Sequence, residues 1–272
     1  MSSIGTLCIR ADANPSIGMG HVMRCLALAQ AWQDRGGHVV LVSALQLPAL
    51  IDRMKAEKLE LVPVTAEPGS ADDLAFTIAT AQRHGARWIV LDGYFFTPDY
   101  MHGIQKAGLH LLLLDDVADR ELGGIESILN QNAYATPELY ARFQPAPHLL
   151  LSSPHTLLRR EFLQRRGAKS IADIGTRVVI TMGGADPANV TQQVMQALAR
   201  VSKHPLEVRI LVGAANRNLP ALQEALPHLQ AVHQAEILVN SPDVPGHMAW
   251  SDVTITAAGS SCWELFCLGV PA

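Results

Sequence analysis

The sequence has few cysteines, no excess of positive charge and no long apolar run, and each of these features excludes a class of protein. Its four cysteines, at positions 8, 25, 262 and 267, form no CxxC pair and no metal-ligand cluster. Isolated cysteines in apolar surroundings are usually small buried hydrophobic side chains, so we expect reduced thiols, no metal site and a cytoplasmic location. The formal net charge of −4 at pH 7 gives no sign of a nucleic-acid-binding surface.

Long hydrophobic segments are also missing. The N-terminus lacks the basic segment and following apolar run of a signal peptide. The longest uncharged apolar stretch, residues 39–51, is shorter than the roughly 20 residues that a membrane-spanning helix needs, and it contains Pro48. We therefore expect no membrane insertion.

What the sequence has in quantity is short apolar segments separated by stretches of helical periodicity. In the first half the apolar segments are TLCIRA, HVVLVSA, LELVPV, WIVLDG, HLLLLDD and PHLLLSS. They are continuous rather than alternating, which is typical of strands buried on both faces of a parallel sheet. Helices are expected between them at residues 22–35, 47–57, 72–84 and 98–107. This alternation predicts a doubly wound α/β domain.

A second alternation starts after residue 176. The segments RVVITMGG and EVRILVGA are typical of strands, DPANVTQQVMQALARV of a helix, and DVTITAAGSSCWELFCLG of a strand, a turn and a helix. A chain of 272 residues is long enough for two domains, which we place at 1–155 and 156–272. The final LGVPA normally leads into another strand, so we expect the second domain to be either incomplete or unusually small.

Residues 16–32, SIGMGHVMRCLALAQAW, place a histidine directly after a glycine pair and before an amphipathic helix. Gly18 and Gly20 would let a phosphate approach the unpaired N–H groups of that helix, at the carboxyl end of the first strand. The loop is not a dinucleotide fingerprint, because position 23 is Met23, so a nicotinamide cofactor is not expected. His21 is either a polar residue at a helix start or a general base whose neutral form the helix N-terminus favours.

Several segments, taken in order, resemble one enzyme family. They are IRADANPSIGMGHVMRCLALAQAW, IVLDGYFF, LLLLDD, NQN, LLRREF, TMGGADPANVT and AAGSSCWELFCLGVP. They are similar to the UDP-sugar hydrolases of pseudaminic acid biosynthesis, which look like MurG-type GT-B glycosyltransferases. The resemblance implies two Rossmann-like domains whose parallel sheets face a central cleft. It also implies release of UDP from UDP-2,4-diacetamido-2,4,6-trideoxy-β-L-altropyranose by attack of water on the anomeric carbon with inversion, without metal or cofactor.

The resemblance assigns roles to individual residues. His21 would be the general base that activates the water. The residues expected to bind the substrate around it are Arg10, Asp12, Gly18, Gly20, Arg24, Asp92, Tyr94, Asn130 and Asn132. Those expected to bind the nucleotide are Gly183, Gly184, Gly259, Ser260, Ser261 and Glu264, of which the glutamate would accept hydrogen bonds from the ribose hydroxyls.

Structural explanations compete with several of these assignments. Arg10 and Asp12 could form a local ion pair, Arg24 could be a surface arginine, and Glu264 could be a favourable acidic residue in a first helical turn. The tyrosine at position 94 could equally be the buried cap of a strand. Asp115 and Asp116 end the strand HLLLLDD, but nothing in the sequence supports a paired-carboxylate site there.

Two other functions stay open at this point. One is a GT-B glycosyltransferase that moves a UDP-linked amino sugar to an acceptor other than water, and the other is a non-enzymatic nucleotide-sugar-binding protein. Residues 149–162 have serines and a histidine where the family more often has glycine and tyrosine. The family also continues beyond position 272 with a segment that contacts the nucleotide.

Overall fold

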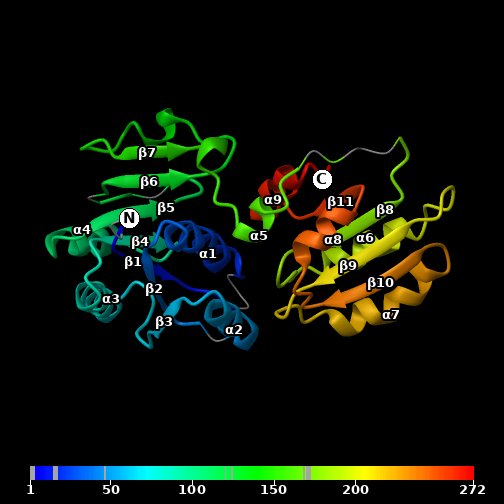
Figure 1. Ribbon diagram of the computed structural model, residues 1–272, viewed down its shortest axis with the longest axis horizontal. Helices are drawn as coiled ribbons and strands as arrows, with labels where there is room; N and C mark the ends of the chain where they lie inside the picture. Colours follow the sequence, from blue (N-terminus) through cyan, green and yellow to red (C-terminus); the bar gives the residue numbers. More distant parts are fainter. Residues whose placement is uncertain are drawn as a thin grey trace. The chain divides into compact units, whose positions relative to one another are not determined.

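The structure, a computed structural model, describes residues 4–14, 18–45, 47–119, 121–123, 125–167, 169 and 173–272. The chain divides into two compact units, one formed by residues 1–14 and 21–157 and the other by 15–20 and 158–272. Figure 1 shows strands alternating with helices over residues 6–114 and again over residues 177–268. Residues 15–17 of the predicted phosphate loop lie outside the described residues.

The first unit is built on a parallel sheet. Within the described residues it has seven strands in the order β3-β2-β1-β4-β5-β6-β7 (Figure 1). The strands are β1 (Thr6–Ala11), β2 (His38–Ser43), β3 (Glu60–Pro63), β4 (Trp88–Asp92), β5 (His110–Leu114), β6 (Ser127–Asn130) and β7 (His148–Leu151). The strand order reverses between β1 and β4, and a sheet of this kind binds ligands at the carboxyl ends of the strands where the order reverses.

The helices of the first unit begin within a helical turn of the positions expected from the sequence. They are α1 (Gly20–Gln33), α2 (Pro48–Ala56), α3 (Ala71–Arg83) and α4 (Pro98–Lys106), with short 3₁₀ helices η1 (Pro137–Tyr140) and η2 (Ser153–His155). Side-chain caps fix two of these starts. Ser70 accepts a hydrogen bond from the backbone of Asp73 at the start of α3, and Thr97 accepts one from Tyr100 at the start of α4.

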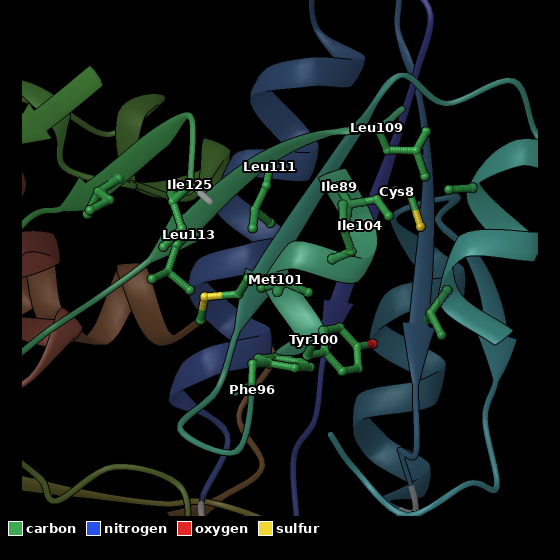
Figure 2. Packing of buried hydrophobic residues seen from close by; sticks show 14 of the residues in the cluster. Cys8, Ile89, Phe96, Tyr100, Met101, Ile104, Leu109, Leu111, Leu113 and Ile125 are labelled. Carbon is green, nitrogen blue, oxygen red and sulfur yellow. The ribbon is translucent and has the colours of Figure 1, made fainter. Parts of the chain in front are cut away.

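The core of the first unit joins the central strands to α3 and α4. Ile89 of β4 and Leu111 of β5 are fully buried, together with Met101 and Ile104 of α4 (Figure 2). Each fully buried side chain of this size contributes about 1.5–3 kcal/mol relative to an exposed one. The core therefore fixes β4 and β5, whose carboxyl ends carry polar residues.

One arginine is buried in this unit among carboxylates. The Arg10 guanidinium, which has no exposed surface, donates hydrogen bonds to Asp12 at 2.5 Å and to Asp73 at 2.8 and 3.2 Å. The rings of Phe95 and Phe96 lie 5.6 and 5.8 Å from it. A charge of this kind can be buried only when it is paired and hydrogen-bonded. The contacts of Arg10 therefore tie β1 to α3 and to the segment that follows β4.

The second unit has a smaller parallel sheet. Its strands among the described residues are ordered β10-β9-β8-β11. They are β8 (Arg177–Thr181), β9 (Glu207–Val212), β10 (Gln234–Val239) and β11 (Val253–Thr256). The helices are α5 (Arg160–Leu163), α6 (Val190–Leu198), α7 (Leu219–Gln230), α8 (Val244–Trp250) and α9 (Ser260–Leu268). Among the described helices of both units, none has the length and hydrophobicity that crossing a bilayer requires.

Candidate functional site

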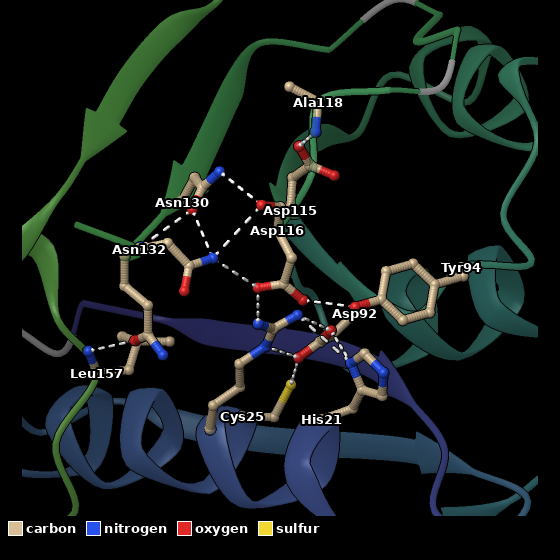
Figure 3. A network of polar contacts seen from close by, with 12 residues as sticks. His21, Cys25, Asp92, Tyr94, Asp115, Asp116, Ala118, Asn130, Asn132 and Leu157 are labelled. Carbon is tan, nitrogen blue, oxygen red and sulfur yellow. Dashed lines mark hydrogen bonds and ion pairs between the residues drawn. The ribbon is translucent and has the colours of Figure 1, made fainter. Parts of the chain in front are cut away.

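A cluster of polar side chains lies where β4 and β5 end and α1 begins (Figure 3). Asp92 is the last residue of β4, and Tyr94 and Asp116 follow β4 and β5. His21 and Arg24 come from the first two turns of α1. The carboxyl ends of parallel strands meet at one edge of a sheet, which lets Arg24 bond to Asp116, 92 positions away in the sequence. We call these five residues the His21 cluster.

The proton positions on His21 follow from its partner. Its Nδ1 lies 2.6 Å from Oδ1 of Asp92, a side chain with no exposed surface. An ionised carboxylate can only accept hydrogen bonds, so Nδ1 carries a proton and donates it. On a neutral ring, Nε2 then holds a lone pair. The side chain of His21 is 11% exposed, and the ring of Tyr94 meets it edge-on with the centroids 5.1 Å apart. This is the arrangement of a general base oriented by a carboxylate.

Arg24 joins the two carboxylates of the cluster. Its Nε and one terminal nitrogen donate to the two oxygens of Asp92, both at 2.6 Å, and its other terminal nitrogen donates to Asp116 at 2.6 Å. Burial alone would lower the pKa of Arg24, but the hydrogen bonds and charges of Asp92 and Asp116 outweigh burial and raise it. Arg24 is therefore a charged, largely buried partner of two carboxylates and not a surface arginine.

Asp116, which the sequence places at the end of a strand without a role in the site, accepts hydrogen bonds from several neighbouring side chains. Its carboxylate accepts hydrogen bonds from Arg24, from the Tyr94 hydroxyl at 2.7 Å and from the Asn132 amide at 3.2 Å. Its backbone carbonyl accepts one from the hydroxyl of Tyr134. Burial would raise the pKa of Asp116, but the hydrogen bonds and charge of Arg24 outweigh burial and lower it. The available signal was its position directly after a buried strand.

The two predicted asparagines differ in what they can offer a ligand. Asn130 is fully buried, and its amide nitrogen donates to the Tyr140 hydroxyl at 2.9 Å and to the backbone carbonyl of Asp116 at 3.3 Å. Its side-chain oxygen accepts from the backbone and the side chain of Asn132. Tyr140 in turn donates to Asp115 at 2.8 Å. Asn130 therefore supports its neighbour, whereas Asn132 is half-buried at the edge of the network.

The glycines before α1 leave an open approach to the helix start. Gly18 has φ +77°, a left-handed conformation that favours glycine, and Gly20 is the first residue of α1. Apart from the adjacent residues and the backbone of α1 itself, no heavy atom of the described residues lies within 4 Å of the position that a Cβ would occupy on either glycine. The unpaired N–H groups of the first turn of α1 are a favourable place for an anion. Phosphate binding by Gly18 and Gly20 stays a prediction.

Arg10 and Asp12, predicted to bind substrate, belong to the buried ion pairs described above. Arg10 is completely enclosed by its carboxylate and aromatic partners, and Asp12 is 4% exposed. Oδ1 of Asp12 also accepts a hydrogen bond from the backbone of Ala44 at 2.7 Å. These contacts account for Arg10, whereas Oδ2 of Asp12 is buried without a hydrogen-bond partner among the described residues. Substrate binding by the two residues stays a prediction.

In the second unit, the loop that follows β9 closely approaches Gly184, one of the predicted glycines. Gly183 follows β8 with φ +80°. A Cβ on Gly213, which follows β9, would lie 2.6 Å from the Cα atom of Gly184. Real Cβ atoms do not approach a backbone this closely, so glycine at position 213 is required by packing. Gly183 and Gly184 stay predicted phosphate contacts.

Glu264 has a partner that the sequence analysis did not identify. It is 6% exposed and accepts hydrogen bonds on one oxygen from Nε and a terminal nitrogen of Arg159, both at 2.8 Å. Burial raises the pKa of Glu264, and the charge of Arg159 offsets only part of this effect. Gly259 precedes α9, and Ser260 and Ser261 form its first turn.

Among the described residues of the chain, no group of three or more His, Cys, Asp or Glu side chains is placed to hold a metal ion.

The chain is similar to known proteins in sequence and in fold. No protein-family model matches the chain. The chain is 25% identical, over 217 residues, to the UDP-2,4-diacetamido-2,4,6-trideoxy-beta-L-altropyranose hydrolase of Campylobacter jejuni, which covers 79% of this chain and 72% of that protein. It resembles the crystal structure of Acinetobacter baumannii MurG with a TM-score of 0.56 and 14% identity, covering 94% of this chain and 73% of MurG.

A further solved structure is similar over the same extent. Alr3699/HepE of Anabaena, in complex with UDP and glucose, has a TM-score of 0.57 and 12% identity, covering 92% of this chain and 73% of HepE. The fold is the GT-B fold. In the first sheet of this chain, the strand order reverses between β1 and β4. The His21 cluster lies at the carboxyl ends of the strands at this point, where sheets of this kind bind ligands.

Proposed function

We propose that this protein is a hydrolase that releases UDP from a UDP-linked 2,4-diacetamido-2,4,6-trideoxyhexose, a step of pseudaminic acid biosynthesis. The observation that carries the proposal is the 2.6 Å contact between Nδ1 of His21 and Asp92, because it leaves Nε2 to take a proton from water. The similarity to the Campylobacter enzyme supports the class of substrate.

In the proposed reaction, Nε2 of His21 removes a proton from a water molecule as the water oxygen bonds to the anomeric carbon. The bond between that carbon and the diphosphate oxygen breaks, and its electron pair leaves with UDP. Attack from the side opposite the leaving group inverts the anomeric carbon. Asp92 stabilises the imidazolium that forms. The N–H groups at Gly18, Gly20 and the start of α1 would stabilise the departing diphosphate.

The proposed nucleotide contacts lie in the second unit. Glu264 would accept hydrogen bonds from the ribose hydroxyls, and Arg159 holds its carboxylate in place. Gly183, Gly184, Gly259, Ser260 and Ser261 would bind phosphate through backbone N–H groups and hydroxyls. Asn132 and Tyr94, at the edge of the His21 cluster, are the proposed contacts to the acetamido and hydroxyl groups of the sugar.

The alternative is a glycosyltransferase that uses the same base. An imidazole that deprotonates water also deprotonates an acceptor hydroxyl, and GT-B neighbours such as MurG share the fold. Incubation with the UDP-sugar in H₂¹⁸O, without any acceptor, separates the two functions. We expect free UDP without ¹⁸O and a sugar with ¹⁸O at its anomeric carbon, both measured by mass spectrometry. In ¹H NMR spectra, the inverted anomer of the free sugar should appear first.

Other outcomes of this experiment count against the hydrolase. Turnover that requires an added acceptor would identify a transferase, and binding of UDP-sugar without turnover under any condition would identify a binding protein. A panel of UDP-diacetamido-trideoxyhexoses in the same assay identifies the preferred stereoisomer from the ratio of kcat/KM values.

Replacing Asp92 with Asn is expected to lower kcat by about 10²-fold or more. The amide keeps the size of the side chain but removes the negative charge that stabilises the imidazolium, and it no longer fixes the proton on Nδ1. Steady-state release of UDP measures the effect. Asp52→Asn is the matched control, because Asp52 is exposed on α2 and loses the same charge. Equal activity of the Asp92 variant and the control would remove Asp92 from the mechanism.

A further inference from the structure

Arg24 is placed to act on His21 through Asp92. The two α1 residues are three positions apart and therefore lie on the same face of the helix. Asp92 receives Nδ1–H of His21 and two N–H groups of Arg24, so imidazole and guanidinium share one carboxylate. A terminal nitrogen of Arg24 also lies 3.4 Å from Nδ1 of His21.

We propose that Arg24 is a positioning residue that supplies the counter-charge for Asp92 and so keeps His21 neutral, with its proton on Nδ1, in the pH range in which the enzyme works. The proposal rests on the hydrolase function proposed above and deepens it. It replaces the expectation from the sequence that Arg24 contacts the substrate.

The burial of Asp92 determines which partners it needs. A carboxylate with no exposed surface requires a nearby positive charge. With His21 as its only partner, the carboxylate would favour protonation of the ring, and a proton on Nε2 would block the base. Arg24 provides the positive charge permanently, because its guanidinium does not lose its proton. The ring can then stay neutral while it still donates to Asp92.

Repulsion acts in the same direction. A guanidinium 3.4 Å from the imidazole disfavours a second positive charge on the ring. The guanidinium therefore opposes the attraction of the Asp92 carboxylate for a second proton on the ring, and the hydrogen bond that orients the ring stays in place.

The other groups that face His21 do not replace this charge. Tyr94 contributes a ring edge, and its hydroxyl donates to Asp116. Asp116 carries the second negative charge of the cluster and is paired with Arg24. The Cys25 thiol lies 3.5 Å from Asp92, and burial, then the charge of Asp92, raises its pKa, so the thiol stays neutral. Without Arg24, the ring would face two carboxylates and no cation.

The pH dependence of kcat/KM tests the proposal. Replacing Arg24 with Gln should move the acid limb of the profile to higher pH by about one unit or more, because the ring binds a second proton more readily once the cation is gone. The loss is then about tenfold or more on the acid side and smaller at high pH. Arg24→Lys restores the charge and should return the limb to its wild-type position. Arg35→Gln, at an exposed position just after α1, is the matched control.

A second measurement does not depend on turnover. In protein labelled with ¹⁵N-histidine, long-range ¹H–¹⁵N correlation reports the tautomer of each ring, and the His21→Gln spectrum assigns the signal of His21. We expect the Nδ1–H tautomer in the wild type, a titration midpoint at higher pH in Arg24→Gln and a return to the wild-type midpoint in Arg24→Lys. This NMR measurement needs no substrate and gives the same information even if the protein hydrolyses no UDP-sugar. A failure of the proposal about Arg24 can therefore be told apart from a failure of the proposed function.

The proposal is overturned if Arg24→Gln loses activity equally at every pH and leaves the His21 midpoint unchanged, which would mean a purely structural role. Should Arg24→Gln fail to fold by circular dichroism, Asp116→Asn decides the matter. It removes one of the two negative charges next to Arg24, so the acid limb and the His21 midpoint should move to lower pH. An unchanged midpoint in that variant contradicts the proposal.

Discussion

Replacing His21 with Gln is expected to lower kcat for UDP release by about 10²–10⁴-fold, the range that a positioned general base contributes. Gln keeps a polar side chain at the start of α1 but cannot take a proton from water at neutral pH. The amide group still reaches Asp92, so the carboxylate keeps a donor and the fold is expected to survive. Single-turnover release of UDP, separated by ion-exchange chromatography, measures the rate of the chemical step.

Binding should be retained in the same variant. UDP contacts proposed for the glycine turns and Glu264 do not involve the imidazole, so calorimetry should give an unchanged dissociation constant for UDP. His204→Gln, at an exposed position between α6 and β9, is the matched control. Full turnover in the His21 variant would refute the mechanism, and loss of UDP binding together with turnover would indicate a structural defect.

Replacing Arg10 with Met is expected to lower the free energy of unfolding of the first unit by about 3–5 kcal/mol. The substitution leaves Asp12 and Asp73 as buried carboxylates without their shared cation, because both lie almost entirely out of contact with solvent. Urea titration measures the effect. In a background with Trp250→Phe and Trp263→Phe, the fluorescence of the remaining Trp32 and Trp88 reports on the first unit alone.

The double variant Arg10→Met with Asp73→Leu provides the control. Removing a buried charge together with its partner is much less costly than removing one of the two, so this variant should recover a large part of the lost stability. If the double variant is less stable than Arg10→Met alone, the ion pair is not the origin of the effect and the packing of Arg10 against Phe95 and Phe96 is.

Local sequence patterns predicted the architecture well, because buried parallel strands are continuous apolar runs. The expected helices of the first unit lie within a turn of α1 to α4. The strands β6 and β10 were missed, along with α5, α7 and α8. The strand β6 is only four residues long, too short to stand out as an apolar run. The residues of β10 alternate between half-buried and exposed positions at the sheet edge, so QAEILV lacks the continuous apolar signature.

The candidate site was predictable only where its residues are local. The glycine loop and His21 lie within one short segment, and Asp92 ends a recognisable strand. The partners of these residues could not be read from local patterns. Arg24 bonds to Asp116, which is 92 positions away in the sequence, and Arg159 bonds to Glu264, which is 105 positions away. Pairings of this length depend on which strand ends become neighbours in the folded sheet.

The segment after β4 carries one exposed side chain at the site and two that pack in the core, and this difference matters for changing the substrate specificity. Tyr94 is 57% exposed beside the His21 cluster, whereas Phe96 is 2% exposed and packs with Phe95 around Arg10. Directed evolution toward a different sugar nucleotide can therefore randomise position 94, and the exposed Tyr134, while the two phenylalanines keep the loop anchored. A library that also varies positions 95 and 96 would fill with clones that express poorly.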